Sequence, residues 1–185
     1  MNEQSGMDGY LFFFLAGILI IAAIIDIYLR KIPNLLTFPA IIIALLYHSI
    51  YYGLNGLLFS VAGLLVGMIA LGILYIFGAM GAGDVKLMGA VGAVLGPKIV
   101  LNAFLFTGII GGIYAIIIIL FRFQASRKML HRIITILKTF FVTGTFIPIP
   151  ASEDEKNPKL CYGIAIALGT LITIWLKAAN YNLPI

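Results

Sequence analysis

The sequence predicts an all-α membrane protein with about six transmembrane helices, and its composition carries that prediction. Of the 185 residues, 62% are hydrophobic and only 10% are charged. Soluble domains carry about 25% charged residues, and one soluble core of this length could not bury so much apolar surface. The excess is expected to face lipid, so we expect one membrane-embedded domain over residues 1–185.

Apolar segments long enough for membrane helices follow one another along the chain. A helix needs about 20 apolar residues to cross a bilayer, and this length divides the chain into segments at residues 10–28, 35–52, 57–77, 85–95, 99–121 and 160–177. We expect the first to be a membrane helix and not a cleaved signal peptide, because Glu3 and Asp8 stand where a basic region would be. The fourth is short and glycine-rich, and only Gly96-Pro97-Lys98 separates it from the fifth.

The distribution of lysine and arginine predicts that both termini lie outside the cytoplasm. In that orientation the outer side keeps only Lys98 and Lys177. The cytoplasmic side then collects ten of the twelve basic residues, namely Arg30, Lys31, Lys86, Arg122, Arg127, Lys128, Arg132, Lys138, Lys156 and Lys159.

The segment at about 122–158 is the one sizeable region without a spanning pattern. Its first half repeats basic and polar residues at steps of three and four, which predicts an amphipathic helix lying in the cytoplasmic interface against anionic lipids. Its second half holds three prolines and the acidic run 153–155, which indicates a solvated loop. No nucleic-acid motif accompanies the basic residues, so we expect no nucleic-acid partner.

Two acidic residues, Asp26 and Asp84, lie within or at the edge of apolar segments. A carboxylate at membrane depth costs a few kcal/mol and usually marks a functional site. Asp26 stands near the cytoplasmic end of the first segment and Asp84 near the cytoplasmic start of the fourth. Two carboxyl groups that meet can share one proton, because like charges in contact cannot both ionise cheaply. Such a pair can perform acid–base hydrolysis.

Structural explanations for both acids remain open at this point. Asp26 could pair with Arg30 four residues later on the same helix. Asp84 could pair with Lys86 or cap the start of its own helix. An ion carrier would also use intramembrane acids and a helix interrupted by glycines, and an assembly scaffold would need neither aspartate.

Other chemistries find less support. Gly81 and Gly83 are not followed by the third glycine of a GxGxxG loop, and no GxxxxGK[ST], HExxH or GxSxG motif occurs. His48 and His131 accompany no nucleophile or metal-binding set, and we expect both to be structural. The single cysteine, Cys161, is expected to be a small buried hydrophobe. The sequence therefore predicts no metal site and no cofactor.

The motifs around the two acids resemble those of the type IV prepilin peptidases. The stretch from Asp26 through Arg30, Ile32, Pro33 and Asn34 resembles that family's D-x(3)-R-x-I-P-N region. The stretch Gly81-Ala82-Gly83-Asp84-Val85-Lys86-Leu87 resembles its GxGDVKL motif, and Cys161-Tyr162-Gly163 is similar to the P-Y-G that often begins its last span. Presenilin-type peptidases share GxGD, but their Tyr-Asp and Pro-Ala-Leu motifs do not occur here.

The resemblance implies a multi-pass aspartic endopeptidase of the cytoplasmic (inner) membrane of a prokaryote. Asp26 and Asp84 would be its catalytic pair, and it would remove the short basic leader from prepilin or pilin-like substrates at the cytoplasmic face. Six further residues would shape the site and bind substrate, namely Gly81, Gly83, Lys86, Arg30, Pro33 and Asn34. The short link between the first two segments resembles the form without a methyltransferase insertion, as in tight-adherence pilus and archaeal preflagellin peptidases.

Overall fold

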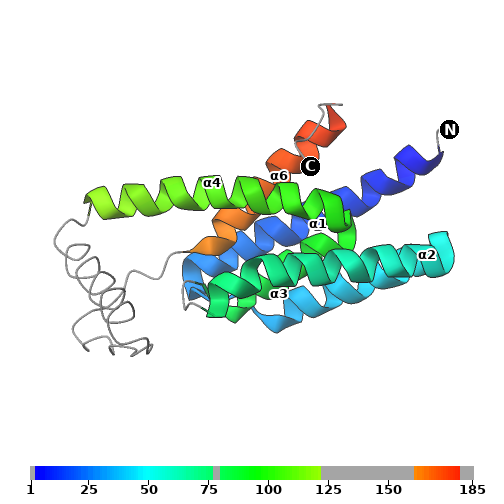
Figure 1. Ribbon diagram of the computed structural model, residues 1–185, viewed down its shortest axis with the longest axis horizontal. Helices are drawn as coiled ribbons and strands as arrows, with labels where there is room; N and C mark the ends of the chain where they lie inside the picture. Colours follow the sequence, from blue (N-terminus) through cyan, green and yellow to red (C-terminus); the bar gives the residue numbers. More distant parts are fainter. Residues whose placement is uncertain (1–2, 77–79, 122–160, 180–185) are drawn as a thin grey trace, which may run out of the picture. The chain divides into compact units, whose positions relative to one another are not determined.

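The computed structural model describes residues 3–76, 80–121 and 161–179, and every element in those ranges is an α-helix. The helices are α1 (Glu3–Leu29), α2 (Asn34–Ile76), α3 (Ala82–Leu95), α4 (Pro97–Phe121) and α6 (Tyr162–Ala178), as drawn in Figure 1. The all-helical class is confirmed for the described residues. The expected interfacial helix at 122–158 and His131 lie outside them.

The chain divides into two compact units. One comprises Met1–Gly111 with Leu160–Ile185, and the other comprises Gly112–Lys159. Both aspartates belong to the first unit, so the description below concerns that unit. The expectation of a single domain over residues 1–185 stays a prediction.

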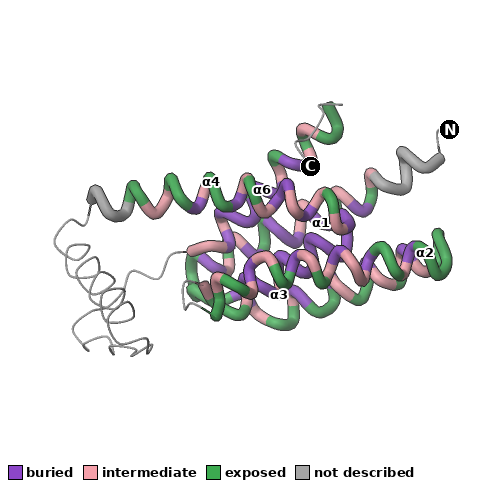
Figure 2. The backbone as a smooth tube through the Cα atoms, in the orientation of Figure 1, coloured by how far each residue is buried: buried purple, intermediate pink, exposed green. Residues whose placement is uncertain are grey.

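Three described helices are long and apolar enough to cross a membrane, namely Gly9–Leu29 within α1, Asn34–Ile76, and Pro97–Ile117 within α4. The apolar helix α6 is shorter. Large aliphatic and aromatic side chains stay exposed along these helices, which alternate between buried and exposed positions in Figure 2. In water such exposure would be unfavourable, and it suits a multi-pass membrane protein whose outer surface meets lipid.

The 43-residue helix α2 is two helices joined at a turn. Gly53 has φ 61° and ψ −146°, a left-handed conformation that glycine adopts without steric cost. The chain doubles back there, so that the two halves of α2 run side by side in Figure 1. The expected segments 35–52 and 57–77 fall on either side of this turn, although residue 77 lies beyond the described part.

Both halves of α2 pack on α3. In the first half, Asn34 contacts Lys86 and His48 contacts Val94, so this half runs parallel to α3. In the second half, a Cβ at Gly63 would meet the backbone of Gly92 and a Cβ at Gly67 would meet that of Met88, so this half runs antiparallel. The glycines let the helix backbones approach closely, as small residues do in membrane helix pairs.

The helix α3 is enclosed by its neighbours. Its residues 84–95 are buried except for the half-buried Lys86. Its 14 residues give a length of about 21 Å, which is less than the roughly 30 Å of a bilayer's hydrocarbon core. The expected fourth segment is therefore a helix that is too short to cross a bilayer of this thickness fully.

The carboxyl end of α3 finds its hydrogen-bond donors inside the protein. The Ser60 hydroxyl donates to the carbonyl of Ala93 at 2.8 Å, and Nε2 of His48 lies 3.2 Å from the carbonyl oxygen of Val94. Helix ends leave unpaired carbonyls that are costly to bury in an apolar medium, so these side chains stabilise a buried helix end. Gly96 then turns the chain with φ 83°, and α4 begins at Pro97.

Candidate active site

Asp26 lies near the carboxyl end of α1 and is buried. Its Oδ2 accepts a hydrogen bond of 2.9 Å from the backbone N–H of Gly163, in the first turn of α6. Its own carbonyl oxygen accepts the backbone N–H of Arg30 at 2.9 Å, which closes the last turn of α1. The carboxylate thus sits at the amino end of a second helix, where free N–H groups and the helix dipole favour negative charge.

The structure does not place Asp26 and Arg30 as an i, i+4 pair on one helix. Arg30 follows the last residue of α1 and has φ 53°, a left-handed conformation that costs a non-glycine residue about 1 kcal/mol. Its side chain is exposed, whereas that of Asp26 is buried. The hydrogen bond that holds the Asp26 carboxylate comes from α6, which lies 137 residues later in the chain.

Asp84 is buried in the first turn of α3. Its Oδ2 accepts the backbone N–H of Gly81 at 3.0 Å, and Gly81 is the residue that caps the helix. The capping role considered from the sequence is therefore present. It does not exclude chemistry, because a carboxylate offers about four acceptor positions on two oxygens and this cap uses one of them.

The two acids lie on helices that pack together, although 57 residues separate Asp26 from Asp84 in the chain. The helices α1, α3 and α6 pack against one another in pairs, and Gly83, directly before Asp84, packs on Ile32 in the link that follows α1. The structure thus joins three helix ends around two buried acids, an arrangement suited to sharing a proton.

Cys161 differs from the expectation of a buried hydrophobe. Its side chain is half-buried and its Sγ donates to the carbonyl oxygen of Asp26 at 3.6 Å. The side chain is only half-buried because Cys161 lies directly before α6, at the end of that helix, and contacts the end of α1.

Lys86 binds Asn34 and not Asp84. Its Nζ donates to Oδ1 of Asn34 at 2.9 Å and lies 5.2 Å from the ring centroid of Phe38. The contact joins the second turn of α3 to the first residue of α2. Pro33 precedes that residue, and its carbonyl accepts the N–H of Leu36 at 3.1 Å.

Gly83 brings α3 against the link between α1 and α2. A Cβ at position 83 would lie 3.1 Å from Cβ of Ile32 and 3.2 Å from its carbonyl oxygen. A Cβ at Gly81 would lie 3.4 Å from Oδ2 of Asp84, which is ordinary van der Waals contact. The first glycine of the motif therefore leaves space beside the carboxylate, and the second permits close packing.

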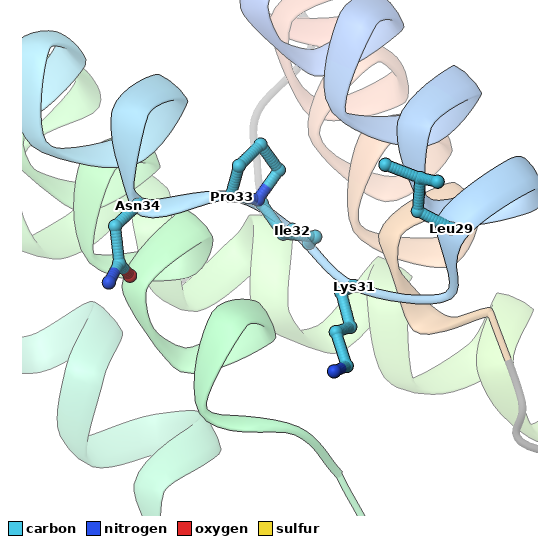
Figure 3. Close-up of a pocket in the computed structure, with 5 residues that line it drawn as sticks. All are labelled: Leu29, Lys31, Ile32, Pro33 and Asn34. Atoms are coloured by element: carbon cyan, nitrogen blue, oxygen red, sulfur yellow. The ribbon is translucent and has the colours of Figure 1, made fainter.

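An open pocket lies along the link between α1 and α2. Its volume is about 580 Å³, and it is lined by Leu29, Lys31, Ile32, Pro33 and Asn34. Figure 3 shows these five side chains at the last residue of α1, along the non-helical link, and at the first residue of α2. Because Ile32 packs on Gly83 and Asn34 binds Lys86, the pocket lies beside the segment that carries Asp84.

The contact between Lys86 and Asn34 is expected to stabilise the fold modestly. Lys86→Met and Asn34→Ala should each lower Tm by about 1–3 °C, because each removes one hydrogen bond to a partly exposed charge. The double variant should lose less than the sum of the two, since both substitutions remove the same contact. Thermal unfolding in detergent measures this, with Lys98→Met at an exposed lysine as the control. If the falls in Tm of the two single variants added up fully in the double variant, the contact between Lys86 and Asn34 would not stabilise the fold.

Sequence reasoning missed the contribution of α6 to the site. The backbone N–H of Gly163 is a donor to Asp26 that no side-chain pattern reveals. The available signal is the Tyr162-Gly163 pair at the start of the last apolar segment.

Comparison with known proteins matches this chain to a leader peptidase family and to a curated leader peptidase. The model of the Type IV leader peptidase family matches residues 13–116, a stretch that contains both aspartates and the Gly81–Lys86 motif. The Prepilin leader peptidase/N-methyltransferase of Bacillus subtilis (strain 168) is 36% identical over 117 residues, which cover 62% of this chain and 46% of that protein. The match thus spans less than half the length of the curated relative. No solved structure matches the chain.

Proposed function

The chain belongs to the type IV leader peptidase family, and we propose from this that it is a membrane aspartic endopeptidase. Its proposed reaction is removal of the short basic leader from type IV prepilin-like substrates at the cytoplasmic membrane face. The observation that carries the proposal is the placement of Asp26 and Asp84, two buried acids on the helices α1 and α3, which pack against each other and against α6.

The proposed chemistry needs one proton shared by the pair. The ionised carboxyl accepts a proton from a water molecule whose oxygen adds to the scissile carbonyl carbon. The protonated carboxyl donates to the carbonyl oxygen, so that a tetrahedral intermediate forms. The C–N bond then breaks as the leaving amine takes up the proton that the pair accepted from water, and a hydroxyl of the intermediate returns a proton to the other carboxyl group. The products are the leader's carboxyl group and a new amino terminus, and the pair again holds one proton. The proton belongs to the pair, so the roles are not divided between the two residues.

The other motif residues have proposed roles in shaping this site. Gly81 leaves room beside the Asp84 carboxylate, and Gly83 sets the approach of α3 to Ile32. Lys86 and Asn34 tie α3 to α2, and Pro33 starts that helix. Arg30 turns the chain out of α1 four residues after Asp26. Substrate would reach the pair beside the pocket at residues 29–34.

The proposed topology has six membrane segments with both termini outside, in the cytoplasmic membrane of a prokaryote. Support comes from the long apolar helices, the turn at Gly53 that divides α2, and the excess of basic residues near one set of helix ends. In this orientation Asp26 and Asp84 lie at the cytoplasmic face, where a prepilin's basic leader would be.

We further propose that the chain cleaves without methylating its product. Only residues 30–33 separate α1 from α2, which leaves no room there for an inserted methyltransferase segment. The chain would therefore lack the N-methyltransferase activity that the name of its Bacillus subtilis relative includes.

A reconstituted cleavage assay tests the proposed function. The full chain in vesicles containing anionic lipid is incubated with a prepilin-like substrate, with and without a methyl donor, and the products are weighed by mass spectrometry. We expect a leader and a mature chain of unmodified mass. Intact substrate over folded protein would overturn the peptidase, and an ion flux through the same vesicles would favour the carrier instead.

A further inference from the structure

The first turn of α6 contacts Asp26 from outside the stretch that identifies the family. The family match ends at residue 116, whereas α6 spans Tyr162–Ala178. Two groups at its start reach Asp26, namely the backbone N–H of Gly163 and the thiol of Cys161. The environment of one proposed catalytic acid therefore depends on a helix beyond the residues that the family model matches.

Position 163 has room for glycine alone. A Cβ there would lie 2.9 Å from Oδ2 of Asp26, 3.0 Å from its Cβ and 3.2 Å from its Cγ. These atoms belong to a short side chain on a buried stretch of α1, which has little freedom to move aside. A side chain at 163 would consequently displace the carboxyl group.

Backbone conformation does not explain this glycine. Gly53 and Gly96 are the described glycines with positive φ, and Gly163 is not among them. Inside a helix, glycine costs about 1 kcal/mol relative to alanine. The space that it leaves for the carboxylate and the N–H that it presents are thus the features that a glycine provides here.

The hydrogen bond from Gly163 fixes the orientation of a group that has few other restraints. An aspartate carboxyl rotates about its terminal bond within a broad range, and the 2.9 Å bond from the N–H selects one orientation of Oδ2. The donor is among the N–H groups that a helix leaves unpaired in its first turn, so α6 loses no internal bond by giving it. The remaining oxygen of Asp26 is then available for the other carboxyl or for water.

From this geometry we propose that Gly163 is a positioning residue for the peptidase reaction. Its N–H holds the Asp26 carboxyl in the orientation that faces the site, and its missing side chain keeps that position open. The inference rests on the proposed function, because positioning has a kinetic meaning only if Asp26 takes part in hydrolysis.

The first test compares Gly163→Ala with Gly108→Ala, since a Cβ at Gly108 meets no atom within 4 Å. Both variants and the wild type are assayed for leader cleavage in the same vesicles, and kcat and KM are measured separately. A displaced catalytic group costs about 100-fold in rate, so Gly163→Ala should lose about that much in kcat with KM unchanged. Gly108→Ala should match the wild type in both constants.

A second variant removes the N–H without adding an atom that could clash. Glycolic acid in place of Gly163, introduced by cell-free synthesis into vesicles, changes one amide into an ester. The loss of one hydrogen bond of about 1.4 kcal/mol predicts a fall in kcat of about tenfold. This variant keeps the inference open to refutation even if Gly163→Ala does not fold.

The outcomes separate the two claims. A wild-type chain without activity overturns the proposed function, and this inference with it. An active wild type whose ester variant keeps full kcat overturns this inference alone, as does a loss that appears only in KM. A selective fall in kcat for the ester variant, with the Gly108 control unchanged, supports it.

Discussion

Asp26→Asn and Asp84→Asn are each expected to lower kcat for leader cleavage by about 10²–10⁴-fold, the range that acid–base groups contribute. The amide has the shape of the carboxyl group but does not gain or lose a proton near neutral pH, so it cannot act as a general acid or base. Its oxygen can still accept the N–H that the structure aims at each position, from Gly163 at Asp26 and from Gly81 at Asp84. The fold should survive while the chemistry is lost.

Stability and additivity make this prediction sharper. Tm should not fall in either variant, because a neutral amide is less costly to bury than a carboxylate. The double variant should be about as inactive as each single one, since residues that act as a unit are not additive. Asp154→Asn, in the acidic run outside the described residues, is the matched control and should cleave normally. A single variant at 26 or 84 that cleaves at the wild-type rate would refute the aspartyl mechanism.

Gly83→Val is expected to give the other large effect, a loss of about 100-fold in kcat. Residue 83 touches Ile32 so closely that a Cβ would stand 3.1 Å from that side chain and 3.2 Å from its carbonyl oxygen. Ile32 is itself buried, so two further methyl groups at 83 would push the start of α3 away from the link. Asp84 follows directly and would move with it, away from Asp26.

A graded series separates this displacement from general damage. Gly83→Ala should fall between the wild type and Gly83→Val, because its Cβ requires a shift of only a few tenths of an ångström. Gly72→Val is the matched control, since a Cβ at Gly72 in α2 meets no atom within 4 Å. Steady-state cleavage and Tm are measured for all three. Normal cleavage by Gly83→Val would show that this contact does not set the position of Asp84.

Much of the outline could be predicted from the sequence because membrane helices are local. Segments 10–28 and 99–121 needed only a run of apolar residues, and the structure has α1 and α4 there. The division between segments 35–52 and 57–77 was also visible, since Gly53 and Asn55 interrupt the apolar run. The two acids stood out because so few charges occur in such segments.

Hydrogen bonds at the site could not be predicted in the same way. Lys86 is two residues from Asp84 in sequence, which favoured a pair. Positions two residues apart on a helix do not face each other, however, and Lys86 reaches Asn34 instead. The short α3 looked like a spanning segment, and its burial depends on both halves of α2 packing against it.

The sequence by itself determined the helical class, the apolar segments and the identity of the two acids, because periodicity, composition and short motifs are properties of neighbouring residues. The tertiary structure decided which groups surround those acids. Gly163 reaches Asp26 across 137 positions of chain, and it does so through a backbone N–H, a group that every residue except proline has. Local sequence carries no record of which distant N–H a carboxylate will meet, since helix packing alone brings the two together.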